Sequence, residues 1–179
     1  MNLCQACGLC CNGVMFHTVR LQPADSAKEL AALGLKLKRK KGAHYILQPC
    51  PAWQDSQCSI YAARPERCRL FECRQLQRVA TGETTEAAAL EKIRDVQSRV
   101  AHLEALLARA GRTDAKKPLT KRCEKILAEP LDATSDPDAL ALRKALTRAM
   151  QELNAMLDAD FRLIPIGAPG AEEEPTVLS

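Results

Sequence analysis

Hydrophobic and polar residues follow two different patterns along the chain, and the change falls near Gly82. Beyond this residue, apolar side chains recur every three or four positions, which is the period of an amphipathic helix. The pattern predicts a long helix over 85–111, capped by a threonine, and a short helix over 119–129. A third helix is predicted to begin at Asp136-Pro137, where a capping residue precedes a first-turn proline.

Each of the two long helices carries its apolar residues on one face. In the first, the spacing alternates between four and three residues, which is typical of the seam of a coiled coil or of a helical hairpin. These positions are Ala89, Ile93, Val96, Val100, Leu103, Leu107 and Ala110 in the first helix, and Leu142, Leu146, Leu153, Leu157 and Phe161 in the third. We expect the long helices to pack antiparallel with the short helix across their end, although three heptads do not distinguish this from a coiled coil between chains.

Before Gly82 the predicted elements are short and separated by turn residues. Residues 14–21 and 44–47 are rich in β-branched and apolar side chains and are predicted to be strands. A capping box at Ser26 predicts a short helix that ends at Gly34. Between these elements, the sequence predicts a basic loop or hairpin over residues 36–42.

Two further elements complete this region. Residues 57–61 are predicted to be a short strand. A helix is predicted to begin at Arg64-Pro65, to carry both Cys68 and Cys73, and to end by Gly82.

These elements together predict an α+β fold. We expect a small, cysteine-rich, metal-stabilised head with short strands over residues 1–80, followed by a helical hairpin arm over residues 81–165. Residues 163–166 are predicted to add a closing strand. Residues 168–179 contain three consecutive glutamates, two prolines and a glycine, and this composition predicts a disordered acidic tail over residues 166–179.

The composition agrees with a helical protein, because aromatic residues make up only 3% of the 179 residues. No charged leader followed by an apolar run begins the chain, and no segment reaches the roughly 20 apolar residues that span a bilayer. We therefore expect a cytoplasmic protein with no membrane partner. Thiols stay reduced in that compartment, so a dense cysteine pattern indicates metal binding rather than disulfides.

Eight of the nine cysteines lie within the first 73 residues. They are Cys4, Cys7, Cys10, Cys11, Cys50, Cys58, Cys68 and Cys73. Two C-x2-C pairs can hold a tetrahedral zinc ion. A C-x2-C-x2-C run followed by a remote Cys-Pro is also found in iron–sulfur proteins, and here the run is followed by Cys50-Pro51. The spacing alone leaves zinc and an iron–sulfur cluster open.

Two cysteine pairs predict how the eight ligands are shared. Cys10 and Cys11 are adjacent, so in an extended backbone their side chains point to opposite sides. Cys68 and Cys73 are five residues apart, which on an unbroken helix is about 500° and places them on different faces. Either the helix begins later than Pro65, or these two cysteines belong to different sites. We therefore predict two neighbouring sites that interleave the cysteines, with the partition left open.

The remaining chemistry-bearing residues are weaker signals. Cys123 falls on the apolar face of the short helix and is predicted to be a buried core thiol. His17, His44 and His102 have no partner motif and are not expected to be ligands. Residues 38–41 are basic, but they lack interleaved aromatic residues, so a solvated loop is expected rather than a nucleic-acid site.

Five arginines surround the last two cysteines: Arg64, Arg67, Arg69, Arg74 and Arg78. Guanidinium groups can donate hydrogen bonds to metal-bound sulfur or to nearby carbonyl groups. For Arg74 and Arg78 we expect a solvated helix face instead. Tyr61 could pack over the site, but we expect it to be a core residue.

The cysteine order resembles a known family. Cys4-x2-Cys7-x2-Cys10-Cys11, then Cys50, Cys58-Ser-Ile-Tyr61 and Arg64-Pro65-x2-Cys68-Arg69-x-Phe71-x-Cys73 are similar to the YkgJ-type cysteine-cluster family, which carries a CxxCxxCC signature. The resemblance covers about residues 1–75 and implies that all eight cysteines bind zinc or iron. A flagellin lysine methylase carries a related cysteine pattern with an iron–sulfur cluster.

Three functional hypotheses follow. The first is a cytoplasmic protein that chelates zinc or iron in a structural or carrier role, with an arm that binds a protein partner or self-associates. The second is an iron–sulfur redox or protein-modifying enzyme. The third is a zinc module that binds RNA or the ribosome, suggested by the basic segment 36–41. No Ser-His-Asp, H-E-x-x-H or P-loop motif accompanies the cysteines.

Overall fold

A computed structural model describes residues 3–55, 57–130 and 137–163. The helices are α1 (Leu3–Cys7), α2 (Ala27–Ala32), α3 (Glu66–Leu70), α4 (Arg74–Ala80), α5 (Glu86–Arg109), α6 (Leu119–Ala128) and α7 (Pro137–Asp160), and Tyr61–Ala63 form the 3-10 turn η1. The strands are β1 (Thr18–Arg20), β2 (Leu37–Lys40), β3 (Ala43–Leu47), β4 (Trp53–Gln54) and β5 (Gln57–Cys58). The expected α+β fold class is confirmed.

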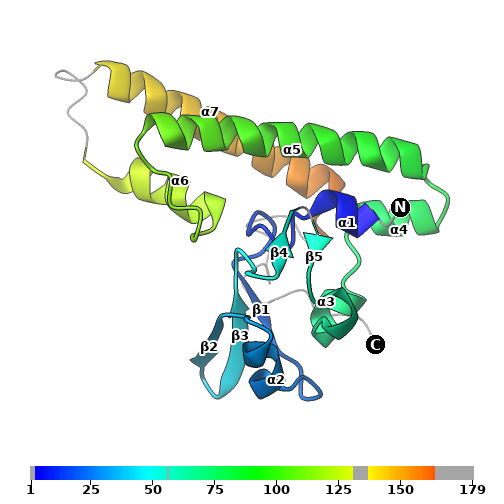
Figure 1. The fold of residues 1–179 in the computed structure, drawn as a ribbon. Coiled ribbons are helices and arrows are strands. Elements are labelled where there is room, and N and C mark those ends of the chain that lie inside the picture. Colours follow the sequence, from blue (N-terminus) through cyan, green and yellow to red (C-terminus); the bar gives the residue numbers. More distant parts are fainter. Residues whose placement is uncertain (1–2, 56, 131–136, 164–179) are drawn as a thin grey trace.

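The two long helices, α5 and α7, lie side by side and run antiparallel (Figure 1). Ion pairs join Lys92 to Asp160 at 3.1 Å and Arg99 to Glu152 at 3.6 Å, so residues farther along α5 meet residues earlier in α7. The apolar faces of α5 and α7 therefore pack against each other within one chain. The predicted apolar positions form a helical hairpin and not a coiled coil between chains.

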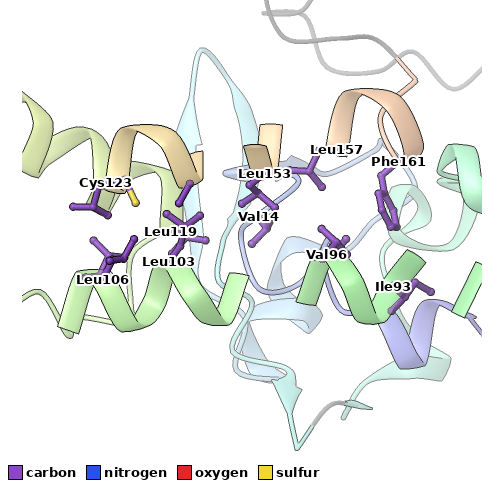
Figure 2. Close-up of a cluster of buried hydrophobic side chains, with 14 of the residues drawn as sticks. Val14, Ile93, Val96, Leu103, Leu106, Leu119, Cys123, Leu153, Leu157 and Phe161 are labelled. Carbon is purple, nitrogen blue, oxygen red and sulfur yellow. The ribbon is translucent and has the colours of Figure 1, made fainter. Parts of the chain in front are cut away.

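The main hydrophobic core joins the N-terminal segment to the arm. Leu103, Leu107, Leu153 and Leu157 are completely buried between α5 and α7. Their neighbours include Leu119 and Cys123 of α6, and also Leu3, Leu9 and Val14 from the first cysteine segment. Figure 2 shows Val14 among side chains of α5, α6 and α7. The cysteine-bearing N-terminus is thus packed onto the helical arm.

Truncating a side chain at the centre of this core should have a large effect on stability. Leu107 has no exposed surface, so Leu107→Ala removes buried atoms and leaves a cavity. We expect the free energy of unfolding to fall by about 2–5 kcal/mol, measured by chemical denaturation of the metal-loaded protein. Leu33→Ala is a matched control, because Leu33 is 48% exposed. Equal losses in the two variants would contradict this account of the core.

The strands form two small sheets below the arm. β1, β3 and β2 make an antiparallel sheet with β3 in the centre, and β4 pairs with β5 in a separate hairpin. Lys41 and Gly42 form the two-residue turn between β2 and β3, both with positive φ, as a tight hairpin turn requires. The basic segment is therefore a hairpin, and Lys38 to Lys41 are exposed.

A second apolar cluster supports these sheets. Its buried members are Leu21, Leu30, Leu35, Ile46 and Ala52. Helix α2 supplies Leu30, and its N-terminus is capped as predicted, because the Ser26 side chain accepts a hydrogen bond from the Glu29 backbone N–H. The cluster is small, so the sheets have few apolar contacts of their own.

The structure corrects several predicted elements. The predicted strand 14–21 forms only at Thr18–Arg20, because Val14 turns into the main core instead of pairing. The predicted strand 57–61 is limited to Gln57–Cys58 and is followed by η1. Leu163 is not in a strand, and the rest of that predicted strand and the acidic tail lie outside the described residues.

The predicted helix from Pro65 to Gly82 is two helices. α3 ends at Leu70, Phe71 has an extended backbone, and α4 begins at Arg74. The Phe71 ring packs edge-on against Phe16, with 5.0 Å between the ring centroids. This contact holds the chain in the break between α3 and α4.

The boundary between head and arm at residue 80 stays a prediction. Within the described part of the chain, no helix has the length and apolar character needed to cross a membrane.

Candidate metal centre

All eight N-terminal cysteines line one cavity of about 150 Å³, next to the arm. They come from α1 and the segment after it, from the segment before β4, from β5, from α3 and from the residue directly before α4. Roughly 15 Å³ of such space is needed for one water molecule, so this cavity has room for several atoms. The structure therefore brings together residues that are up to 69 positions apart, Cys4 and Cys73.

The first cysteines are placed by a helical turn and a glycine. Cys4 and Cys7 are three residues apart on α1 and so share one face. Gly8 ends this helix with φ of +67°, and the Trp53 ring covers the space where a side chain would be. The Cys11 backbone carbonyl accepts a hydrogen bond from the Cys50 N–H at 2.7 Å, which joins the N-terminal segment to the β4–β5 hairpin.

The last two cysteines are separated by the break between α3 and α4. Cys68 lies within α3, whereas Cys73 is the N-cap of α4. The break therefore explains how two cysteines five residues apart reach the same cavity from different directions. The sequence prediction that they would not share one helix face is consistent with this arrangement.

The thiols fall into two electrostatic groups. Cys4 and Cys7 each lie close enough to Cys73 for its charge to raise their pKa, after the larger effect of burial. Burial raises the pKa of Cys10 well above its usual value, and the further causes, in decreasing order, are Cys7, its neighbour Cys11, Cys73 and Cys4. We call Cys4, Cys7, Cys10 and Cys73 the first thiol group.

The other four cysteines form the second thiol group: Cys11, Cys50, Cys58 and Cys68. Burial raises the pKa of Cys11 to about 12, and the next causes are Cys50, Cys68 and Cys58. The pKa of Cys68 is likewise raised to about 12 by burial, then by Cys50 and Cys58. Between the two groups, the charge of Cys11 raises the pKa of its neighbour Cys10, and the charge of Cys4 raises the pKa of Cys11.

The packing of the cysteines agrees with this division. Cys7 and Cys73 pack against the main core, which the arm shares. Cys50 and Cys58 pack against the small second cluster below the sheets. The two thiol groups therefore border different apolar clusters and meet at the adjacent residues Cys10 and Cys11.

Three of the thiols face backbone N–H groups as well as one another. Burial raises the pKa of Cys7 to about 12, while the Leu9 N–H acts in the opposite direction. The N–H groups of residues two or three positions later have the same effect on Cys50 and Cys73. N–H groups directed at sulfur stabilise a thiolate, which is the form that binds metal.

The donor set fits a metal group, although the thiols are spread around the cavity. In the ranges 3–55, 57–130 and 137–163, no three Cys, His, Asp or Glu side chains are close enough together to hold one ion. The Gln48 side chain is 6% exposed and lines the same cavity, and its Oε1 has no hydrogen-bond partner within the described structure. The fit rests instead on the donor set, because eight thiols around one cavity are the ligands that both zinc and iron–sulfur clusters use.

The arginines near the last cysteines have different roles. The Arg64 guanidinium lies over the Tyr61 ring at 3.6 Å, and it donates hydrogen bonds to the backbone carbonyls of Tyr61 and Cys68. Tyr61 lines the cavity and is only partly buried, so it is not the core residue that the sequence predicted.

The expected solvated face for Arg74 and Arg78 is wrong. Arg74 Nη1 donates to the carbonyls of Asp158 and Ala159 at 2.8 and 2.7 Å. Arg78 pairs with Asp160 at 3.3 Å. Both side chains therefore bind the C-terminal end of α7, which the sequence could not place beside α4.

The histidines and the ninth cysteine lie away from the cavity. Cys123 is completely buried in the main core, as predicted. His17 forms a 2.6 Å hydrogen bond with Thr120 of α6, and His102 is exposed on α5. Trp53 and Gln48 line the cavity, and sequence reasoning missed both, because neither belongs to a ligand motif.

A cavity walled by eight cysteines from an α+β head defines a cysteine-rich metal-chelating domain. The model of the CxxCxxCC family, described as "Putative zinc- or iron-chelating domain", matches residues 3–95 of the 179-residue chain. The chain belongs to this family, which confirms the resemblance seen in the cysteine spacing. No curated protein and no solved structure shows a significant match.

Proposed function

We propose that the chain holds metal in two neighbouring sites of four cysteines each. The first thiol group forms one site and the second thiol group forms the other. The observation that carries this proposal is the packing of the thiols, because Cys7 and Cys73 pack against the main core whereas Cys50 and Cys58 pack against the second apolar cluster. The Cys50 N–H also binds the Cys11 carbonyl, which places Cys11 with Cys50. Four thiolates are a complete ligand set both for zinc and for an iron–sulfur cluster.

The spread of the thiols favours iron–sulfur clusters over single ions. With zinc–sulfur bonds of about 2.3 Å, tetrahedral geometry brings the four sulfurs to about 3.8 Å from one another. In an iron–sulfur cluster the cysteines are shared among several irons, so their sulfurs stand farther apart around a larger body. Thiols distributed around a cavity of about 150 Å³ support the second arrangement. A bound cluster would supply one-electron redox chemistry.

Two structural zinc ions are the second candidate. This candidate is favoured by the family description, which includes zinc, and by the number of thiols in each group. Zinc would have a structural or carrier role, because it has no redox chemistry. In both cases the metal would help to fold the head.

The metal should be identified on protein purified without oxygen. Iron with equimolar acid-labile sulfide and a visible absorption that bleaches on reduction would support clusters. About two zinc ions per chain without colour would support the second candidate. Protein that holds neither metal would contradict both.

Serine substitutions test the proposed partition. Cys73→Ser and Cys68→Ser should each remove about half of the bound metal, because each breaks one complete ligand set. The double variant Cys4→Ser/Cys73→Ser should lose no more metal than Cys73→Ser alone, since both changes affect the same site. Cys68→Ser/Cys73→Ser should lose nearly all of it. If Cys4→Ser/Cys73→Ser loses nearly all of the metal and Cys68→Ser/Cys73→Ser loses only half, the proposed partition is wrong.

The cytoplasmic location and a protein partner for the arm stay predictions. The predicted apolar seam of the arm is used in its own core, so a partner would contact the polar outer faces of α5 and α7. The RNA-binding alternative rests on the exposed hairpin of β2 and β3, and the exposed Lys38–Lys41 segment is compatible with a solvated surface.

A further inference from the structure

The short helix α1 depends on α5 for its C-terminal end. α1 has five residues, too few for a stable isolated helix, and its last carbonyl groups have no partner within the helix. Gln97 of α5 extends its side-chain amide to them. Its Nε2 donates to the Ala6 carbonyl at 2.8 Å and to the Cys7 carbonyl at 3.2 Å. Gln97 therefore holds the turn that carries Cys4 and Cys7.

Cys73, the member of the first thiol group that lies farthest along the chain, is held in place by α7. Cys73 is the N-cap of α4, and the next two residues contact the last turn of α7. Arg74 donates to the Asp158 and Ala159 carbonyls, and Gln75 Nε2 donates to the Asp160 carbonyl at 2.9 Å.

A backbone hydrogen bond and two ion pairs add to the contacts of α4 and α5 with the end of α7. The Arg74 N–H donates to the Phe161 carbonyl at 3.0 Å. The Asp160 carboxylate is paired with Arg78 of α4 and with Lys92 of α5. The carbonyl groups at the end of α7, which no residue of that helix can satisfy, are thus satisfied by α4.

Apolar side chains of the arm also form part of the cavity wall. Ile93 of α5 and Phe161, directly after α7, both line the cavity that contains the thiols. Both are almost completely buried in the main core. The core of the arm and the cavity therefore share side chains.

The second thiol group is held differently. The Cys50 N–H donates to the Cys11 carbonyl, Cys58 pairs with Trp53 across the β4–β5 hairpin, and the Cys68 carbonyl accepts from Arg64. All these partners lie within residues 11–68. The second site is accordingly assembled by the head.

We propose that α5 and α7 complete the first metal site, with Gln97 and Arg74 as positioning residues, so that metal binding there and docking of the end of α7 stabilise each other. This inference rests on the proposed two-site function. It extends the first site beyond the family match, which ends at residue 95. Because coupling between two equilibria is reciprocal, loss of metal should loosen α7 and loss of the α7 contact should weaken metal binding.

The first test measures metal release to an excess of chelator, without oxygen, in the full-length protein as purified. Gln97→Ala and Arg74→Ala should each release metal from one of the two sites about 10–100-fold faster, which is the usual effect of removing a group that orients a ligand. The other half of the metal should leave at the unchanged rate. Arg74→Lys should restore part of the slow release, because lysine can still donate to a carbonyl.

Gln151→Ala is the matched control, since it makes the same change on an exposed position of α7. It should leave both release rates unchanged. Faster release from both sites in Gln97→Ala, or from neither, would overturn the inference. Far-UV circular dichroism should be the same in all variants, which separates weakened ligand positioning from general unfolding.

The second test measures the reciprocal effect by hydrogen exchange. Cys4→Ser, in the first thiol group, should reduce protection of the amides at residues 157–162. Cys58→Ser, in the second group, should leave that segment protected. Equal protection in the two variants would overturn the inference while leaving the two-site function intact. A wild-type protein that holds no metal, or whose metal does not divide between the two groups, would overturn both.

Discussion

Removal of the metal without oxygen should unfold the sheet region, residues 18–63, and leave α5, α6 and α7 helical. The second apolar cluster has five buried residues, one of them an alanine, and this is too little to order some 45 residues at about 1–2 kcal/mol of backbone entropy each. We therefore expect metal binding to contribute to folding, as structural zinc sites do by about 10–16 kcal/mol.

The helices of the arm should depend much less on the metal. Their core is formed mainly by the fully buried leucines of α5 and α7, and Cys7 and Cys73 pack against one end of it. Far-UV circular dichroism should retain most of the helical signal after chelation, and limited proteolysis should cut first within residues 18–63. Restoring the metal under reducing conditions should restore protection. An apoprotein whose sheets resist proteolysis as well as the loaded protein does would show that the metal is not structural.

Gly8→Ala should be the most damaging single substitution outside the cysteines. The residue has φ of +67°, and a new Cβ would lie 2.2 Å from Trp53 Cζ2 and 2.8 Å from Cε2. Strain at positive φ costs about 1–3 kcal/mol and overpacking against a rigid ring about 1–3 kcal/mol, so we expect a loss of about 2–6 kcal/mol in the free energy of unfolding. Metal content should fall with it, because Gly8 lies directly after Cys7.

Gly34→Ala is the control for this prediction. Gly34 has φ of +88°, but a Cβ there would meet nothing within 4 Å. The Gly34→Ala variant should therefore lose only the stability that the backbone strain costs, and it should keep its metal. Combining Gly8→Ala with Trp53→Leu should recover part of the loss. If denaturation midpoints and metal content are the same for Gly8→Ala and Gly34→Ala, the Trp53 contact has no role in shaping the cysteine segment.

The sequence was sufficient to predict the elements whose signals are local. The four–three spacing from Ala89 to Ala110 predicted α5, and the cap at Ser26 predicted α2, because each depends on residues within a few turns. The clustering of cysteines predicted the family, and the adjacency of Cys10 and Cys11 suggested two sites. These inferences need only the geometry of a strand or a helix.

The remaining features depend on contacts between distant residues. The end of α3 depends on Phe71 packing against Phe16, 55 positions earlier, and the role of Arg74 depends on carbonyls 84 and 85 positions later. Val14 lies in the helical core instead of a strand because α5, α6 and α7 offer it a buried position. Local periodicity contains none of this information.

The packing of the N-terminus onto the arm has a consequence for biosynthesis. Leu3, Leu9 and Val14 are synthesised well before their partners in α7, which are among the last of the described residues to be made. At about 5–20 residues per second, the roughly 150 residues between Cys11 and the end of α7 require on the order of ten to thirty seconds of translation. During this interval the first thiol group lacks its contacts with α7, so its nascent cysteines are open to oxidants and to any metal that is present.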